Sequence, residues 1–259
     1  MSYPGGKGAS GVVQQIINQQ PPHDLYVEPY FGGGRVFRAK RPAASNILID
    51  LSEDAIGAYH RNPAPATLAF TSDALWFLRE PEAYGERFTS RTLIYCDPPY
   101  PLGSRRRARK LYDFEMTDAQ HLELITTLRK LRCMVQISSY ENRMYSTLLK
   151  DWRLVTFQAR TRGCTMTEHL WMNYPEPVAL HDFSHLGIDY RERERIRRKT
   201  VRWVNRIQSL PKLESVALLS ALSYGFEKTT GADPAPPFSA GTTAHDGAHG
   251  LNLPHPAEV

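Results

Sequence analysis

The chain has 259 residues, of which 41% are hydrophobic, with a formal net charge of +5 and a pI near 9.1. This length suffices for one α/β domain of ordinary size plus a small appendage, and the composition supports a real core. The positive charge fits a polyanionic partner, although net charge says nothing about fold. Three widely spaced cysteines (Cys96, Cys133 and Cys164), without a Cys-x-x-Cys pair, argue against a disulfide framework and a zinc site.

Targeting and membrane signals are absent from the sequence. No apolar run approaches the roughly 20 residues that a membrane span needs, and the N-terminal residues hold no signal-peptide core. The histidines near the C-terminus are too isolated to predict a metal site. We therefore expect a cytoplasmic protein with reduced thiols, no membrane partner and no metal.

A glycine-rich segment, residues 2–8, precedes the first predicted helix. Apolar residues then follow at helical spacing: Val12, Val13, Ile16 and Ile17. A glycine-rich turn at a helix start exposes backbone N–H groups, and Lys7 adds a positive charge, so this corner could hold a carboxylate or phosphate. The alternative is a flexible terminus without a function.

A second glycine turn follows a short β-prone run at residues 25–28. The run stops at Pro29, and three glycines at 32–34 precede another predicted helix. This order of strand, glycine turn and helix is typical of the first crossover in nucleotide-binding folds. The spacing matches neither the dinucleotide fingerprint nor a P-loop, so we expect a site for a nucleoside without a pyrophosphate.

Two acids end the next segments. Asp50 closes a buried strand predicted at 46–50, roughly 20 residues beyond the glycine turn, where a carboxylate can bind ribose hydroxyls. A simple strand-end turn is the alternative, and Ser52 is predicted to cap the next helix. Residues 61–68 are predicted to form a connector. Asp73 then either contacts the adenine of a nucleoside or caps a helix.

The strand predicted at 93–96 runs into Asp97-Pro98-Pro99-Tyr100. Proline has no N–H donor for a sheet ladder, so the chain must turn here. Asp97 and Tyr100 are thereby placed at a strand's carboxyl end, where open α/β sheets bind ligands. An acid, a rigid carbonyl and an aromatic face suit a planar ring with an amino group, although a plain surface loop gives the same pattern.

The second half of the domain continues the α/β pattern. A basic run at 105–110 predicts phosphate contacts, and 117–131 predicts a capped amphipathic helix. A strand at 134–138 leads into a loop at 138–140. Strands at 153–159 and 169–173 are predicted to form an antiparallel edge.

The composition changes near residue 186. Residues 186–228 predict a basic helical hairpin, which could clamp nucleic acid, mediate dimerisation or pack on the core. Residues 229–259 are predicted to be a disordered tail. Residues 1–185 then form the main domain, with short recognition segments at about 74–92 and 101–112.

The three motifs at 3–7, 28–34 and 97–100 occur in an order that resembles the Dam-type adenine-specific DNA methyltransferases of the alpha group. The resemblance extends to Asp50, to 138–140 and to 168–174, and covers about residues 2–178. It implies a Rossmann-like α/β sheet with helices on both faces that binds S-adenosylmethionine. It also implies a bacterial or phage enzyme acting on duplex DNA at the nucleoid, with or without a restriction endonuclease partner.

The resemblance assigns roles to individual residues. Asp97 and the Pro98 carbonyl would accept hydrogen bonds from the amine of a flipped adenine on which Tyr100 stacks. The residues expected to bind the cofactor are Tyr3, Gly6, Lys7, Glu28, Pro29, Phe31, Gly32, Gly33, Gly34, Asp50, Asp73 and Asp97. Independently of the resemblance, the basic run predicts phosphate contacts, with a solvated surface loop as the alternative; its residues are Arg105, Arg106, Arg107, Arg109 and Lys110.

The sequence departs from the family in one respect. The recognition region before Asp97 is short, so sequence readout is expected either to be short and relaxed or to lie in the 101–112 loop and the basic C-terminal hairpin. RNA adenine-N6 methylation and an inactive nucleic-acid-binding protein are the alternatives. The recognition sequence and the oligomeric state stay open.

Overall fold

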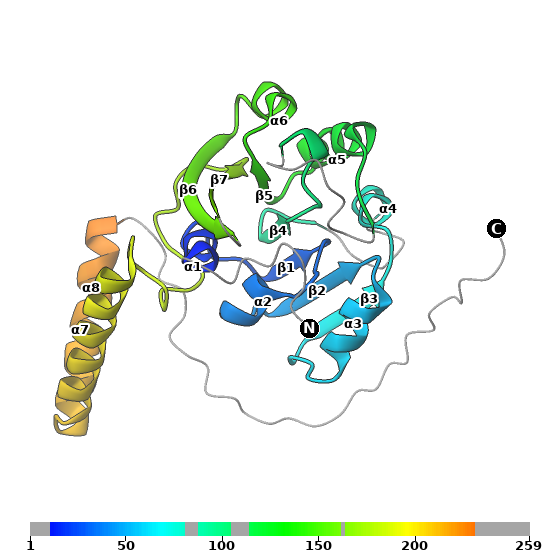
Figure 1. Ribbon diagram of the computed structural model, residues 1–259. Coiled ribbons are helices and arrows are strands. Elements are labelled where there is room, and N and C mark those ends of the chain that lie inside the picture. Colours follow the sequence, from blue (N-terminus) through cyan, green and yellow to red (C-terminus); the bar gives the residue numbers. More distant parts are fainter. Residues whose placement is uncertain (1–10, 81–87, 105–113, 162–163, 231–259) are drawn as a thin grey trace. The chain divides into compact units, whose positions relative to one another are not determined.

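The computed structural model describes residues 11–80, 88–104, 114–161 and 164–230 (Figure 1). The chain divides into two compact units, Met1–Arg198 and Lys199–Val259, each of which is described by itself. The boundary falls 13 residues after the predicted one at 185/186. None of the described helices is both long and apolar enough to span a membrane.

The first unit is built on a seven-stranded sheet. Its strands are β1 (Leu25–Glu28), β2 (Ser45–Asp50), β3 (Thr67–Thr71), β4 (Thr92–Cys96), β5 (Met134–Tyr140), β6 (Arg153–Thr161) and β7 (Cys164–Met172). Their order is β3-β2-β1-β4-β5-β7-β6, and β1 to β5 are mutually parallel. The order reverses between β1 and β4, which defines a topological switch point. The Rossmann-like α/β prediction is confirmed.

Helices cover both faces of the sheet (Figure 1). On one face, α1 (Val12–Ile17), α2 (Arg35–Ala39) and α3 (Glu53–His60) pack against side chains such as Tyr26 and Leu48. On the other face, α4 (Ala74–Arg79), α5 (Asp118–Lys130) and α6 (Arg143–Leu148) pack against Val27 and Ile47. Consecutive strand residues alternate between the two cores, as the two-residue period of a strand requires.

The last three strands confirm the predicted antiparallel edge. Strand β7 pairs antiparallel with both β5 and β6, and both late strands are longer than the predicted ones. Residues 138–140 were expected to form a loop, but they belong to β5, where Ser139 pairs with His169. The prediction failed because hydroxyl side chains usually indicate turns, whereas Ser138 and Ser139 bond Tyr95 and Trp171 inside the core.

Strand β3 was not predicted. Residues 61–68 were taken for a connector, yet Thr67 and Leu68 start β3 and pair with Asn46 and Ile47 of β2. Leu68 is 55% exposed, because β3 lies at the edge of the sheet. The nearby prolines obscured a short edge strand whose apolar residues do not alternate cleanly.

The predicted helix caps are confirmed. The Ser52 hydroxyl accepts a bond from the Ala55 N–H at the start of α3. Thr117 and Gln120 form a reciprocal capping box at α5. These bonds satisfy N–H groups that have no partner within the helix.

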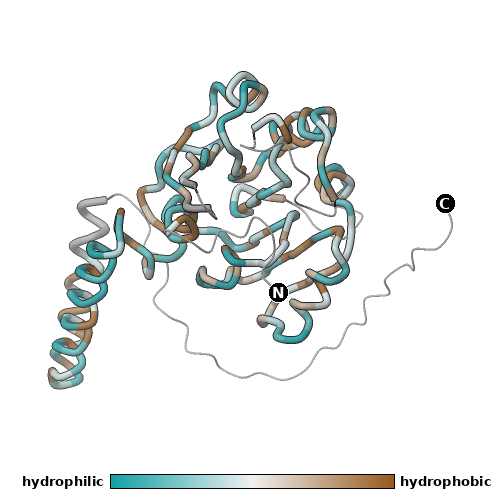
Figure 2. The backbone as a smooth tube through the Cα atoms, viewed as in Figure 1, coloured by the Kyte–Doolittle hydropathy of each residue, from teal (hydrophilic) through white to brown (hydrophobic). Residues whose placement is uncertain are grey.

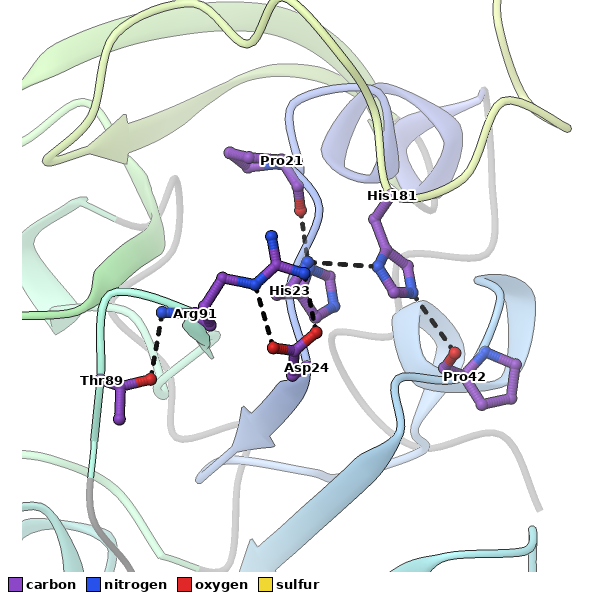
Figure 3. A network of polar contacts seen from close by, with 7 residues as sticks. All are labelled: Pro21, His23, Asp24, Pro42, Thr89, Arg91 and His181. Atoms are coloured by element: carbon purple, nitrogen blue, oxygen red, sulfur yellow. Dashed lines mark hydrogen bonds and ion pairs between the residues drawn. The ribbon is translucent and has the colours of Figure 1, made fainter. Parts of the chain in front are cut away.

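A cluster of polar residues closes the amino ends of the strands (Figure 3). The His23 and His181 rings stack with centroids 3.8 Å apart, and both side chains are buried. The His181 Nδ1 accepts from the His23 N–H, and its Nε2 lies 3.1 Å from the Arg41 carbonyl. This pairing fixes the neutral tautomer with the proton on Nε2. The segment after β7 is thereby fastened to the starts of β1 and β2.

The second unit contains the end of α7 (Tyr190–Gln208) and α8 (Lys212–Thr230). The two predicted helices are present, and the chain turns between them at Pro211. The Ser215 hydroxyl donates to the Ile207 carbonyl at 2.8 Å, which ties the start of α8 to the end of α7. Residues 231–259, most of the predicted tail, lie outside the described residues.

Candidate active site at the carboxyl ends of the strands

The turn after β4 holds the first candidate residues. All five residues of β4 are buried, and the strand ends where Pro98 and Pro99 interrupt the ladder. Asp97 is half-buried. Burial raises the pKa of Glu28 and of Tyr95, and the negative charge of Asp97 adds to both shifts. A carboxylate is therefore fixed at the switch point of the sheet, on a stiff backbone.

Tyr100 is held in place by two other elements. Its hydroxyl donates to a Glu168 carboxylate oxygen, and its ring meets the Tyr140 ring edge-on with centroids 4.6 Å apart. Tyr140 and Glu168 are direct partners across the β5–β7 pair. Burial, with the nearby Asp97 and Glu168 carboxylates, raises the pKa of Tyr100 well above its ordinary value. The ring thus has one orientation set by the sheet itself.

The glycine turn after β1 is a tight backbone loop. The Gly34 N–H donates to the Phe31 carbonyl at 2.7 Å, and Gly34 has a left-handed φ of 59°. A Cβ atom added to Gly34 would lie 2.2 Å from the Phe31 ring. Phe31 itself is 3% exposed and packs against Phe37 and Tyr59. Its ring therefore belongs to the core, and only its backbone can face a ligand.

Asp50 joins the glycine turn to β2. Its carboxylate accepts from the Gly32 N–H at 2.6 Å and from the Ser52 N–H at 2.8 Å. Burial raises the pKa of Asp50, and the N–H donors of Ser52 and Gly32 oppose that rise. The strand-end turn and the ligand-binding prediction are therefore compatible, because each carboxylate oxygen can accept a second bond.

Asp73 lies at the end of β3 and caps α4. Its Oδ1 accepts from the Trp76 N–H at 2.7 Å. The capping alternative is thus confirmed for this residue, and its contact with an adenine stays a prediction. The side chain is nevertheless exposed at the same edge of the sheet as Asp50.

One pocket gathers residues at the carboxyl ends of β1, β2, β3 and β4, although Phe31 and the glycines at 32–34 do not line it. It is lined by Pro29, Tyr30, Asp50, Leu51, Asp73, Ala74, Leu75, Pro99, Phe114, Glu115, Met116 and Gln120. Leu51 and Phe114 are apolar yet 42% and 51% exposed, so they present bare surface there. Apolar walls with carboxylates among them suit a flat, weakly polar ring attached to a hydroxylated group.

Glu28 ends β1 but does not line this pocket. It is 2% exposed, and its Oε2 accepts from the Tyr26 hydroxyl at 2.9 Å. Burial raises its pKa to about 8, helped by the charge of Asp97 and opposed by the Tyr26 bond. Lys40 lies over the Tyr26 ring at 4.1 Å, and burial lowers its pKa to about 7. Glu28 thus belongs to a buried polar cluster with Tyr26 and Lys40, and not to the pocket.

The structure brings some predicted residues together and leaves others untested. Pro29, Asp50 and Asp73 share the pocket, and Pro99 links it to the turn that carries Asp97 and Tyr100. The predicted residues outside the described ranges are Tyr3, Gly6, Lys7, Arg105, Arg106, Arg107, Arg109 and Lys110. Sequence reasoning missed Leu51 and Ala74, although each directly follows a predicted acid. It also missed 114–116, for which the sequence offers no signal.

Of the comparisons with known proteins, the one with solved structures finds proteins similar to this chain. No protein-family model and no curated protein matches the chain. N-methyltransferase NodS from Bradyrhizobium japonicum WM9 is 14% identical, with a TM-score of 0.46 over 63% of this chain and 93% of that one. Magnesium protoporphyrin IX methyltransferase from Synechocystis PCC 6803, solved with bound SAM, is 12% identical, with a TM-score of 0.41 over 63% and 77%. An rRNA methylase from Streptococcus thermophilus is 10% identical, with a TM-score of 0.38 over 62% and 90%.

Proposed function

We propose that this protein transfers a methyl group from S-adenosylmethionine to the N6 amino group of adenine in DNA. One observation carries the proposal. The Asp97–Tyr100 turn and a pocket suited to a nucleoside lie at the same edge of the sheet, and Pro99 belongs to both. A cofactor and a target base can therefore approach each other at the switch point between β1 and β4.

The pocket residues fit the nucleoside part of S-adenosylmethionine. Asp50, already oriented by two N–H donors, would accept from the ribose hydroxyls. Leu51 and Phe114 would cover the faces of the adenine, and Asp73 would accept from its amino group. When bound, the cofactor supplies an activated methyl group on a positively charged sulfur.

The turn after β4 would hold the target adenine. The Asp97 carboxylate and the Pro98 carbonyl accept hydrogen bonds from the exocyclic amine, which directs its lone pair toward the methyl group. The N–C bond forms as the S–C bond breaks, and the amine proton is lost to solvent. Positioning and the fixed negative charge of Asp97 lower the barrier, and no covalent enzyme intermediate forms. An acid at this position favours adenine over cytosine.

The substrate is tested by transfer of labelled methyl groups. Purified protein is incubated with labelled S-adenosylmethionine and either duplex DNA or structured RNA of equal length. We expect methylated adenine in the DNA. Preferential labelling of RNA would establish the alternative adenine-N6 activity, and no transfer to either would contradict the proposal.

Asp97→Ala tests the assignment of the reacting turn. We expect turnover to fall by about 10³-fold or more, because the main acceptor for the amine is lost. Cofactor affinity, measured by calorimetry, should change little. Asp54→Ala, an exposed acid in α3, is the matched control and should keep full activity. Retained turnover in Asp97→Ala would refute the catalytic role.

The sequence specificity of methylation is tested in cells. Long-read mapping of modified adenines in a methylation-free host should reveal a short or relaxed recognition site, and a long strict site would contradict this.

Replacing Arg105, Arg106 and Arg107 together should flatten the salt dependence of DNA binding, because each phosphate contact releases counterions. An unchanged slope would remove that segment from the DNA interface.

A further inference from the structure

The described part of the second unit leaves large apolar side chains exposed. This part, residues 199–230, is the end of α7 followed by α8. This stretch contains no cysteine and no histidine, so neither a disulfide nor a metal site built on such residues lies within it. A partner surface that covers the exposed apolar side chains would therefore stabilise it.

Helix α8 is apolar on more than one side. Its exposed apolar residues are Leu213 (83%), Val216 (55%), Leu218 (40%), Leu219 (51%), Leu222 (47%) and Tyr224 (61%). Figure 2 shows brown, hydrophobic stretches along the hairpin. A surface helix normally shows one apolar stripe, and a helix that is apolar all round is normally buried. One neighbouring helix cannot cover both sides of α8.

The side facing α7 is fixed by Ser215, whose hydroxyl bonds the Ile207 carbonyl. At 100° per residue, Leu218, Leu219 and Leu222 lie on the same side as Ser215. Leu213, Ala217, Ser220 and Tyr224 lie on the opposite side, with Val216 at its margin. The most exposed residues, Leu213 and Tyr224, therefore belong to the face that α7 leaves uncovered.

The uncovered face of α8 is complementary to itself. Large side chains, Leu213 and Tyr224, stand at its two ends, and small ones, Ala217 and Ser220, lie in the middle. If two copies cross antiparallel, Leu213 meets Tyr224 of the partner copy, and the small residues meet at the crossing point. Small residues there let the two helices approach closely. Such a contact repeats itself under two-fold symmetry, as an isologous dimer requires.

Nucleic acid and the C-terminal part of this chain fit the uncovered face of α8 less well than a second copy does. Between 213 and 224 the only charged residue is Glu214, so the face has nothing with which to hold phosphates. The chain after residue 230 is rich in glycine, alanine and proline and has only four large apolar residues, Phe238, Leu251, Leu253 and Val259. A segment of that composition offers little to pack against a 12-residue apolar ridge.

We propose that α8 mediates homodimerisation, with two α7–α8 hairpins forming an antiparallel four-helix assembly around paired α8 helices. The proposal does not depend on the methyltransferase function.

Mass measurement on the full chain tests the proposal. Light scattering should give close to twice the chain mass of 29.4 kDa at high concentration. Val216→Glu should weaken the dimer at least tenfold, because it places a charge in the contact. Leu68→Glu is the matched control, since Leu68 in β3 and Val216 are each 55% exposed. It should leave the dimer intact.

Cross-linking supplies a measurement that does not depend on a disruptive variant. Ser220→Cys lies at the predicted crossing point, whereas Ser215→Cys faces its own α7. A short bis-maleimide should join two copies through Cys at position 220 and not at 215, over the background of the unsubstituted chain. A monomer at every concentration, equal cross-linking at both positions, or a dimer insensitive to Val216→Glu would overturn the proposal.

Discussion

Charged and polar side chains have different hydrogen-bond partners at the two ends of the sheet. At the amino ends, His23, His181, Asp24 and Arg91 bind one another or nearby carbonyls (Figure 3). At the carboxyl ends, Asp50 and Asp73 accept bonds from backbone N–H groups and line a pocket with bare apolar surface. Asp50 is oriented by the backbone without an ion-pair partner among the bonds described.

This difference separates a structural cluster from a candidate site. Side chains that pair with each other fasten segments and have little left to offer a ligand. Carboxylates held by the backbone keep lone pairs for a ligand, and their orientation is already fixed. Buried and perturbed groups occur at both ends, for example His23 at one end and Glu28 at the other. A perturbed pKa alone therefore does not identify the site here.

The largest expected effect concerns the backbone at the carboxyl end. Gly34→Ala should destabilise the fold by about 3–5 kcal/mol, because alanine is strained at a φ of 59° and its Cβ would meet the Phe31 ring. Urea unfolding followed by circular dichroism measures the loss. A loss below about 1 kcal/mol would show that the turn can relax.

Gly57→Ala is the matched control for this substitution. Gly57 lies within α3, and an added Cβ would meet nothing within 4 Å. The same chemical change should therefore stabilise the fold by about 0.5–1 kcal/mol, since alanine favours a helix more than glycine does. Opposite signs at the two glycines would show that geometry, rather than glycine content, controls the result.

The next effect concerns acid sensitivity at the amino end. Burial lowers the pKa of His23 to about 2 and of His181 to about 4 from the ordinary 6.5. Between pH 6.5 and 4 these histidines bind protons in the unfolded chain but not in the folded chain. They therefore make the free energy of unfolding fall as the pH falls. Each contributes about 2 kcal/mol of loss between pH 7 and pH 5.

The contribution of the two histidines to the pH dependence of stability must be isolated with a variant, because Glu28 changes the stability in the opposite direction. Its raised pKa, about 8, lets the folded chain take up a proton before the unfolded chain does, which favours folding as pH falls. His181→Gln should therefore reduce the acid-induced loss between pH 7 and pH 5 by about 2 kcal/mol. His60→Gln, at an exposed position, should not. Equal pH dependence in both variants would contradict the assignment.

The sequence predicted most of the fold and failed where local signals were weak. Buried strands such as β2 and β4 are continuous apolar runs that end in an acid, and the caps at Ser52 and Thr117 use residues with one strong local role. Strand β3 was missed because an edge strand lacks a continuous apolar run. Residues 138–140 were misassigned because their hydroxyls are satisfied by partners distant in sequence.

The site could be predicted only in part for a similar reason. Asp50, Asp73 and the turn after β4 are strand-end residues, and parallel strands bring their carboxyl ends to one edge. Phe114 reaches the pocket from a segment without a periodic pattern. The role of Glu168 depends on the antiparallel β5–β7 register, which places it beside Tyr140 and under Tyr100. Neither fact is encoded in local spacing.

Glu168 allows a test of how rigid the carboxyl end must be. If its carboxylate orients Tyr100, Glu168→Gln and Tyr100→Phe should each lower kcat by about tenfold with cofactor affinity unchanged. The double variant should be no worse than either single one, because the two residues act through one hydrogen bond. Glu176→Gln, at an exposed position, is the control. Additive losses would indicate separate roles.

The smallest expected effect returns to the amino end, where Arg91 and Asp24 form two hydrogen bonds of 2.9 and 2.7 Å. The side chains are 55% and 62% exposed, so water and salt screen the pair, and a double-mutant cycle should give a coupling below about 1 kcal/mol. Arg91 is only the last of the causes that lower the pKa of His23, after burial. Arg91→Ala should therefore leave the acid sensitivity nearly unchanged, whereas His181→Gln reduces it. If Arg91→Ala reduced it equally, the exposed ion pair, and not the burial of the stacked rings, would keep the histidines neutral.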